Sequence, residues 1–83
     1  MTLQEEFEEA VNRTKELTQR PSNDVLLKLY ALYKQSTIGD VQGDLPNAMD
    51  FKATAKYRAW ESLKGKPANT CQKDYIDLVN SLE

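Results

Sequence analysis

Histidine is absent from this sequence of 83 residues, and cysteine occurs only once, as Cys71. Without histidine, neither a Ser-His nor a Cys-His catalytic pair can form, and the Cys and His spacings of zinc sites are missing as well. The few glycines do not form a phosphate-cradling loop pattern. We therefore predict a protein that is not an enzyme and that carries no metal and no cofactor.

A lone cysteine also excludes an intramolecular disulfide. Small secreted domains usually need several disulfides, so Cys71 indicates a reducing compartment. No apolar run approaches the roughly 18 residues that span a bilayer, and the N-terminus lacks the basic and apolar segments of a signal peptide. We expect a cytoplasmic protein without stable membrane insertion.

Net charge is small, since 11 basic and 13 acidic side chains give a total of −2. The molecule as a whole therefore does not attract nucleic acid. Residues 51–66 nevertheless carry five basic side chains against the single acid Glu61, so this segment is a candidate site for a smaller anion. A composition of 40% hydrophobic and 29% charged residues is typical of a folded chain, and the length allows one domain, residues 1–83.

The strand-type alternation of apolar and polar residues is absent, and four segments show helical patterns instead. Caps, glycines and prolines set their expected limits. The first predicted helix has about 15 residues, begins at the Thr2–Glu5 capping box and ends before Pro21. The second extends from a cap at Ser22, Asn23 or Asp24 to about Ile38. The third extends from the cap Asp50 to about Lys64, and the fourth starts at Pro67 or Asn69. A loop covers residues 39–50. The architecture predicted is an all-α bundle.

The second helix has two apolar faces. At 100° per residue, Val25, Leu29 and Leu32 share one stripe, and a stripe on nearly the opposite side contains Leu26, Leu27, Tyr30, Tyr33 and Lys34. The second stripe passes from aliphatic to phenolic to cationic, an order that suits an amphipathic anion. Alternatively, a central helix of a small bundle is simply buried nearly all round, with hydroxyl and ammonium groups reaching water.

Two further features have both a structural and a functional interpretation. Lys52 and Lys56 lie one turn apart beside apolar residues of the third helix, which fits an anion site as well as an ordinary solvated face. Cys71 lies on an apolar stripe with Tyr75, and its simplest role is that of a small core residue.

Residues 30–60, YALYKQSTIGDVQGDLPNAMDFKATAKYRAW, resemble the central signature of the acyl-coenzyme A-binding protein family. The family pattern is Tyr-x-x-Tyr-Lys-Gln-x-Thr-x-Gly-Asp, a proline-containing loop, and Asp-Phe-Lys-x-x-Ala-Lys-aromatic-x-x-Trp. All of these elements are present, with Tyr57 where the family usually has tryptophan. The resemblance covers essentially the whole chain and implies a four-helix up-down-down-up bundle.

The resemblance also implies site residues. Tyr30, Tyr33 and Lys34 match the nucleotide clamp, and Lys15 and Lys52 match basic positions on the phosphate side. Lys56 matches the lysine of the third helix, and Tyr75 matches the tyrosine of the fourth helix. The positions implied to line the acyl path are Phe7, Ala10, Leu26 and Leu27.

The function that the resemblance implies is reversible binding of medium- to long-chain fatty acyl-CoA esters by a monomer. Such a protein is an intracellular carrier and pool former in lipid metabolism, with transient contact to acyl-CoA-using enzymes. A first alternative is a helical protein-interaction module whose tyrosine-rich face docks a partner helix. A second is a domain cut from a larger acyl-CoA-using chain, which the capped start at Met1 and Thr2 argues against.

Overall fold

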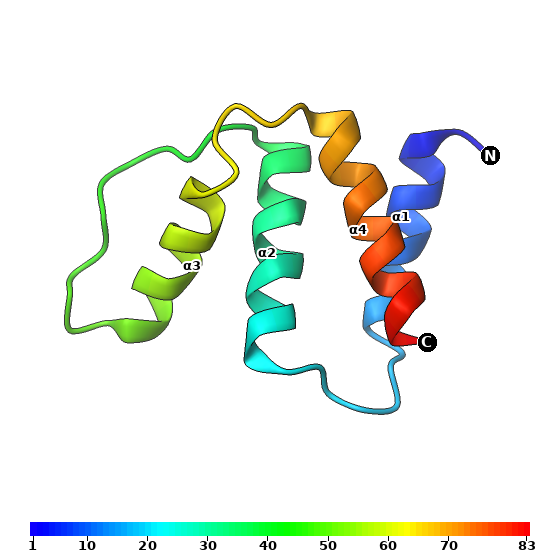
Figure 1. Cartoon of the computed structure of the whole chain (residues 1–83), viewed down its shortest axis with the longest axis horizontal. Coiled ribbons are helices and arrows are strands. Elements are labelled where there is room, and N and C mark those ends of the chain that lie inside the picture. The colour runs from blue at the N-terminus through cyan, green and yellow to red at the C-terminus, as the bar shows by residue number, and fades with distance from the viewer.

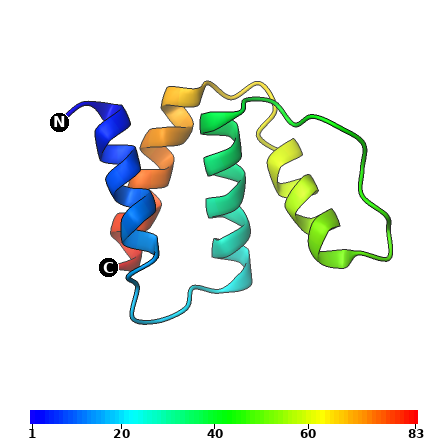
Figure 2. The same ribbon diagram turned by 180° about the vertical axis from the view of Figure 1, so that it is seen from behind.

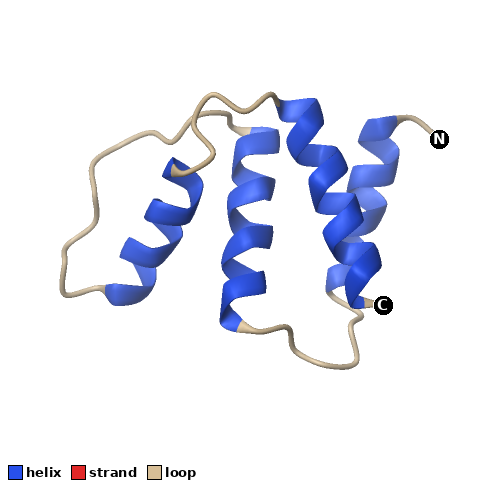
Figure 3. Cartoon of the chain, in the orientation of Figure 1, coloured by secondary structure: helices blue, strands red, loops and turns tan.

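The computed structural model describes residues 1–83 as four α-helices joined by loops, without strands (Figures 1 and 3). The helices are α1 (Leu3–Thr14), α2 (Asn23–Thr37), α3 (Phe51–Glu61) and α4 (Ala68–Leu82). The predicted all-α class is therefore confirmed. None of these helices combines the length and the apolar character needed to cross a bilayer.

The helices follow the up-down-down-up order. Figures 1 and 2 show α2 and α3 running in one direction and α1 and α4 running in the other, as the resemblance implied. α4 packs against both α1 and α2, whereas α3 packs only against α2. The molecule is consequently flat, with extents of 40 × 29 × 15 Å, and α3 lies at one edge. Because α3 has a single helical neighbour, its contact with α2 is open to solvent along its sides.

Side-chain caps begin three of the four helices. The Thr2 hydroxyl accepts the Glu5 N–H at 3.1 Å, and the Glu5 carboxylate accepts the Thr2 N–H at 3.0 Å, which confirms the predicted capping box. Ser22 caps α2 and Asp50 caps α3. α4 begins after Pro67 without a side-chain cap, so the alternative prediction of an Asn69 cap was wrong: Asn69 lies inside the first turn.

Two helices end earlier than predicted. α1 ends at Thr14, where the Thr14 hydroxyl donates to the Val11 carbonyl oxygen at 2.6 Å and the next N–H groups bond three residues back instead of four. α3 ends at Glu61 because the following residues make the same tighter turns until Gly65, whose φ is 86°. The residues after Thr14 and after Glu61 still follow a helical sequence pattern. This pattern does not reveal that their hydrogen bonds change from four residues back to three.

The core is formed mainly by α1, α2 and α4. It contains Phe7, Ala10, Leu29, Leu32, Cys71, Tyr75 and Val79, with partly buried aliphatic side chains around them. Cys71 is fully buried, which confirms its predicted role as a core residue. The stripe of α2 with Leu29 and Leu32 faces this core. The second apolar stripe of α2 is therefore not needed for the core and can contact something else.

A hydrogen-bond network around Asp40 holds the loop after α2 in place. One carboxylate oxygen of Asp40 accepts both the Gly65 N–H at 2.7 Å and the Gln35 side-chain amide at 2.8 Å. Gln35 is buried and also donates to the carbonyl oxygen of Lys66 at 3.1 Å. The Trp60 indole N–H donates to the carbonyl oxygen of Gly39 at 2.7 Å. These bonds tie the C-terminal end of α3 and the linker before α4 to the C-terminal end of α2 and the loop that follows it.

Candidate ligand-binding groove between α2 and α3

A groove of about 580 Å³ runs along the contact between the two parallel helices. We call it the α2–α3 groove. Its lining residues are Arg20, Asn23, Leu26, Leu27, Tyr30, Phe51, Lys52, Ala55 and Lys56. Apolar side chains of both helices form its walls, and all of its charged side chains are cations. The stripe of α2 that faces away from the core therefore lines this groove, at least from Leu26 to Tyr30.

Two lysines from different helices approach the ring of Tyr30 at one end of the groove. The Nζ atoms of Lys34 and Lys56 lie 5.7 and 5.4 Å from the Tyr30 ring centroid, and Lys34 Nζ also lies 5.8 Å from the ring of Trp60. Distances of this size are typical of cation–π contacts. We call Tyr30, Lys34, Lys56 and Trp60 the cationic cluster.

Neither lysine of the cationic cluster has an acidic partner. The ion pairs of the structure join Arg13 to Glu83, Arg58 to Glu61 and Lys66 to Asp74. Lys34 and Lys56 are both partly buried, so their two positive charges are held near one another over apolar surface. A ligand with several negative charges would complement this arrangement.

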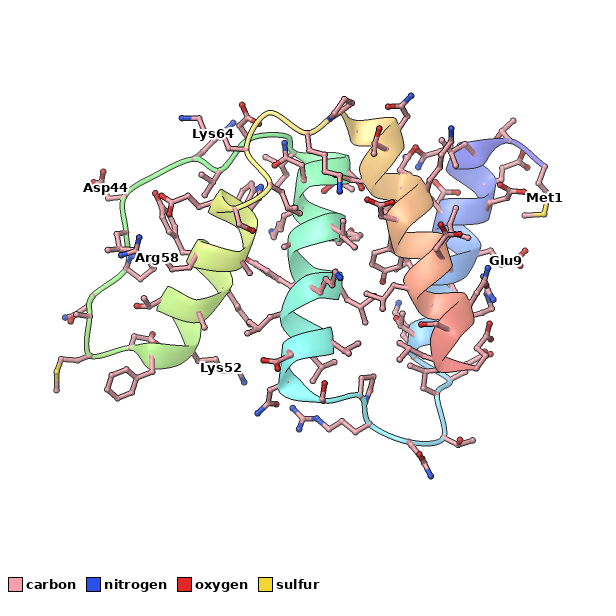
Figure 4. All side chains as sticks on the ribbon, viewed as in Figure 1. Met1, Glu9, Asp44, Lys52, Arg58 and Lys64 are labelled. Carbon is pink, nitrogen blue, oxygen red and sulfur yellow. The ribbon has the colours of Figure 1, made fainter.

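Cations lie at both ends of the groove, the cationic cluster at one end and Arg20 and Lys52 at the other. Tyr30 and Lys56 follow Leu26 and Phe51 in their helices, and α2 and α3 run in the same direction. The cationic cluster consequently lies toward the C-terminal ends of both helices, whereas Leu26 and Phe51 lie at the N-terminal ends. Lys52, labelled in Figure 4, extends from the first turn of α3 toward the start of α2.

A second aromatic group joins α1, α2 and α4. The ring of Phe7 stacks on Tyr33 with centroids 6.1 Å apart and meets the edge of Tyr75 at 5.1 Å. Phe7 and Tyr75 are buried, but 40% of the Tyr33 surface is exposed. Tyr33 is therefore the member of this group that a ligand can reach directly.

The structure brings some of the predicted site residues together and separates others. Leu26, Leu27, Tyr30, Lys52 and Lys56 line the groove, and Lys34 joins its cationic end. Lys15 lies exposed at the C-terminal cap of α1, away from these contacts.

Phe7 and Ala10 lie in the core, with exposed fractions of 2% and 0%. A ligand can touch them only where the side chains above them move. Their implied role in lining the acyl path remains a prediction.

Four groove residues were not identified as site residues from the sequence: Arg20, Asn23, Phe51 and Ala55. Arg20 and Asn23 flank the turn before α2, and neither belongs to a helical pattern of apolar residues. Phe51 could have been found, because it shares its i, i+4 spacing with Ala55 on the same wall.

The buried titratable groups stay neutral. Burial raises the pKa of the Tyr75 phenol and the pKa of the Cys71 thiol. A buried neutral thiol is a poor nucleophile. No group of His, Cys, Asp and Glu side chains is arranged to hold a metal ion.

Another pocket, of about 650 Å³, lies among α2, α3 and α4. Leu27 lines both pockets, but the walls of this one carry Asp24, Asp77 and the ion pair of Lys66 with Asp74, at 2.6 Å. Its mixed charges differ from those of the α2–α3 groove, where every charged side chain is a cation.

A groove whose walls are apolar and whose charged side chains are all cations fits an amphipathic anion. Comparisons with known proteins agree with a ligand of this class. The family described as "Acyl CoA binding protein" matches residues 4–79. An acyl-CoA-binding protein of Saccharomyces cerevisiae is 47% identical over 76 residues, which cover 92% of this chain and 87% of the yeast protein.

Solved structures show the same likeness. The crystal structure of acyl-CoA-binding protein 2 from Oryza sativa has a TM-score of 0.92 and 41% sequence identity, over 98% of this chain and 90% of the rice chain.

Enoyl-CoA delta isomerase 2 of Rattus norvegicus is 46% identical over 79 residues, which cover 95% of this chain but 20% of the isomerase. The chain therefore belongs to the acyl-CoA-binding protein family. Its relatives that match over most of their length are named for binding and not for a reaction.

Proposed function

We propose that this protein binds medium- to long-chain fatty acyl-CoA esters reversibly in the α2–α3 groove. The observation that carries the proposal is the Tyr30 ring approached by the ammonium groups of Lys34 and Lys56, at the end of an apolar groove. An acyl-CoA ester has the matching order of groups: a phosphorylated nucleotide at one end and a hydrocarbon chain at the other.

The head group gains charge-assisted and stacking contacts. A phosphate oxygen bound by a lysine gains about 1.5–3 kcal/mol for each hydrogen bond, and an adenine stacked on an aromatic ring gains about 1–3 kcal/mol. Lys34 and Lys56 supply the central charges, and Lys15 and Lys52 are further phosphate-side cations in this proposal. Tyr30, Tyr33 and Tyr75 supply ring faces or hydroxyl groups.

The acyl chain gains affinity by leaving water. Each buried methylene contributes about 0.8 kcal/mol, so ten methylenes supply about 8 kcal/mol before the cost of ordering the chain. Leu26 and Leu27 provide apolar wall for this purpose. Affinity is therefore expected to rise with chain length for esters that share one head group.

A protein that binds in this way without reacting serves as a carrier and pool former for acyl-CoA in lipid metabolism. We place it in the cytoplasm as a monomer that contacts acyl-CoA-using enzymes transiently. The ligand-binding residues come from one chain, so one ester per monomer is expected. Binding keeps the free concentration of a detergent-like ester low and shields its thioester.

The test is isothermal titration calorimetry with palmitoyl-CoA, coenzyme A and free palmitate. We expect one palmitoyl-CoA per chain, with far tighter binding than either part alone. Equal affinity for palmitate and palmitoyl-CoA would identify a general lipid carrier instead.

The interaction module with a tyrosine-rich docking face predicts no heat with any of these ligands. That outcome would replace the present proposal.

A further inference from the structure

Trp60 is the buried member of the cationic cluster, with 9% of its surface exposed. It lies one turn after Lys56 in α3. Its indole N–H donates to the carbonyl oxygen of Gly39 at 2.7 Å, and its ring centroid lies 5.8 Å from Lys34 Nζ. Trp60 therefore contacts the C-terminal end of α2 at two points, one on the backbone and one on a charged side chain.

Gly39 links the backbone point to Lys34 itself. The Gly39 N–H donates to the carbonyl oxygen of Lys34 at 3.2 Å, and the φ of 99° at Gly39 is one that glycine adopts readily. Trp60, Gly39 and Lys34 thus form a closed circle of contacts, through hydrogen bonds on one side and through the ammonium group on the other. Loss of the indole would loosen the backbone and the ammonium group of Lys34 together.

The ammonium group of Lys34 has a like charge for a neighbour. Lys34 and Lys56 approach the same Tyr30 ring, at 5.7 and 5.4 Å from its centroid, and like charges repel each other. Neither lysine has an acidic partner that would hold it. Lys34 differs from Lys56 in having a second ring, that of Trp60, and indole is the side-chain ring that attracts cations most strongly.

We propose that Trp60 is a positioning residue that holds the ammonium group of Lys34 ready for the anionic part of the ligand. The inference rests on the proposed function and adds a residue that acts on the ligand through Lys34. A lysine that is held in place before binding loses less conformational freedom when the ligand arrives, so the complex is tighter. The effect of Trp60 on affinity should therefore exist only while Lys34 is present.

The experiment is a double-mutant cycle, in which calorimetry measures palmitoyl-CoA binding to the wild type, Trp60→Phe, Lys34→Ala and the double variant. Trp60→Phe should weaken binding about fivefold when Lys34 is present and less than about twofold in the Lys34→Ala background. Tyr57→Phe is the matched control, because it removes a hydroxyl of α3 that donates to the same loop, to the Gly43 carbonyl oxygen at 3.1 Å, outside the cationic cluster. This control should leave the affinity unchanged.

The outcomes separate the two proposals. If the wild type does not bind palmitoyl-CoA, the proposed function is wrong and the inference falls with it. If the wild type binds the ester but Trp60→Phe weakens binding equally in both backgrounds, or in neither, Trp60 does not act through Lys34. A loss with Tyr57→Phe as large as that with Trp60→Phe would also overturn the inference, because it would assign the effect to the loop.

Thermal unfolding identifies a temperature at which the variants are folded, and the titrations are made there. If Trp60→Phe does not fold, the cycle is run with benzothienylalanine at position 60, which keeps the size of the indole and lacks only its N–H. The same dependence on Lys34 is then expected, and its absence would contradict the positioning role.

Discussion

Lys56 Nζ lies 5.4 Å from the ring centroid of Tyr30, a cation–π contact that joins α3 to α2. Since α3 packs against no other helix, this contact helps to fix its position at the edge of the molecule. The same ammonium group has no acidic partner. Lys56 therefore supports the groove in the free protein and presents a charge to a ligand.

Lys56→Ala should weaken palmitoyl-CoA binding by about 1.5–3 kcal/mol, because a charge-assisted phosphate contact is lost. Lys73→Ala is the control, since Lys73 is exposed on α4 and lines neither pocket. Calorimetric titration of both variants measures the difference. Equal losses would mean that overall positive charge, and not the cationic cluster, attracts the ligand.

Phe7→Ala should destabilise the fold by about 3–5 kcal/mol, because it leaves a cavity in the core beneath Tyr33 and Tyr75. Urea unfolding measures the change. Phe51→Ala, which removes an exposed ring, should change the free energy of unfolding by less than about 0.5 kcal/mol. Similar losses for the two variants would contradict the assignment of Phe7 to the core.

Asp40→Ala should destabilise the protein more at neutral pH than in acid. The Gly65 N–H and the Gln35 amide hold the pKa of the Asp40 carboxyl below its ordinary value. A carboxyl whose pKa is lower in the folded state stabilises the fold above its unfolded-state pKa, about 4, and this stabilisation is lost as the pH falls through the lowered folded-state pKa.

Urea unfolding of the wild type and Asp40→Ala at pH 7 and at pH 2.5 measures this effect. The gap in the free energy of unfolding between the two proteins should be smaller at pH 2.5. A gap that is the same at both pH values would show that the Asp40 charge does not strengthen the network with Gln35 and Gly65.

Tyr33→Ala should weaken ester binding by about 1–3 kcal/mol through the loss of a stacking surface for adenine. The loss should persist with a dephospho-CoA ester, which lacks the 3′-phosphate, because stacking does not require that group. Calorimetry with the two esters tests this. A loss that disappears with the dephospho ester would place the Tyr33 hydroxyl, instead of its ring, against the phosphate.

The sequence predicted the division of α2 into two faces correctly. Its 3.6-residue periodicity places Leu29 and Leu32 on a different side of the helix from Leu27 and Tyr30, and the structure directs the first pair to the core and the second to the groove. The caps at Thr2 and Asp50 were predictable because they depend on neighbours only a few residues away.

Other features depend on contacts between distant residues. The periodicity of α1 places Phe7 and Ala10 on one stripe, but it cannot tell a core from a groove, because both are apolar surfaces. Gln35 and Asp40 belong to the family signature, yet their bonds to the linker before α4 become visible only when residues 35–40 and 65–66 are brought together. The spacing of Phe51 and Ala55 indicates a shared apolar face of α3, but only the fold shows that this face lines the groove.

The measurement that tests the central claim most directly is the binding of palmitoyl-CoA and dephospho-palmitoyl-CoA to the wild type and Lys34→Ala. Lys34→Ala should cost about 1.5–3 kcal/mol with palmitoyl-CoA and much less with the dephospho ester, because the 3′-phosphate that we propose as the partner of Lys34 is then missing. Its thermal unfolding should barely change, since Lys34 forms no ion pair. Equal weakening of both esters, or unfolding of the variant, would show that Lys34 is structural and that the cationic cluster does not bind this phosphate.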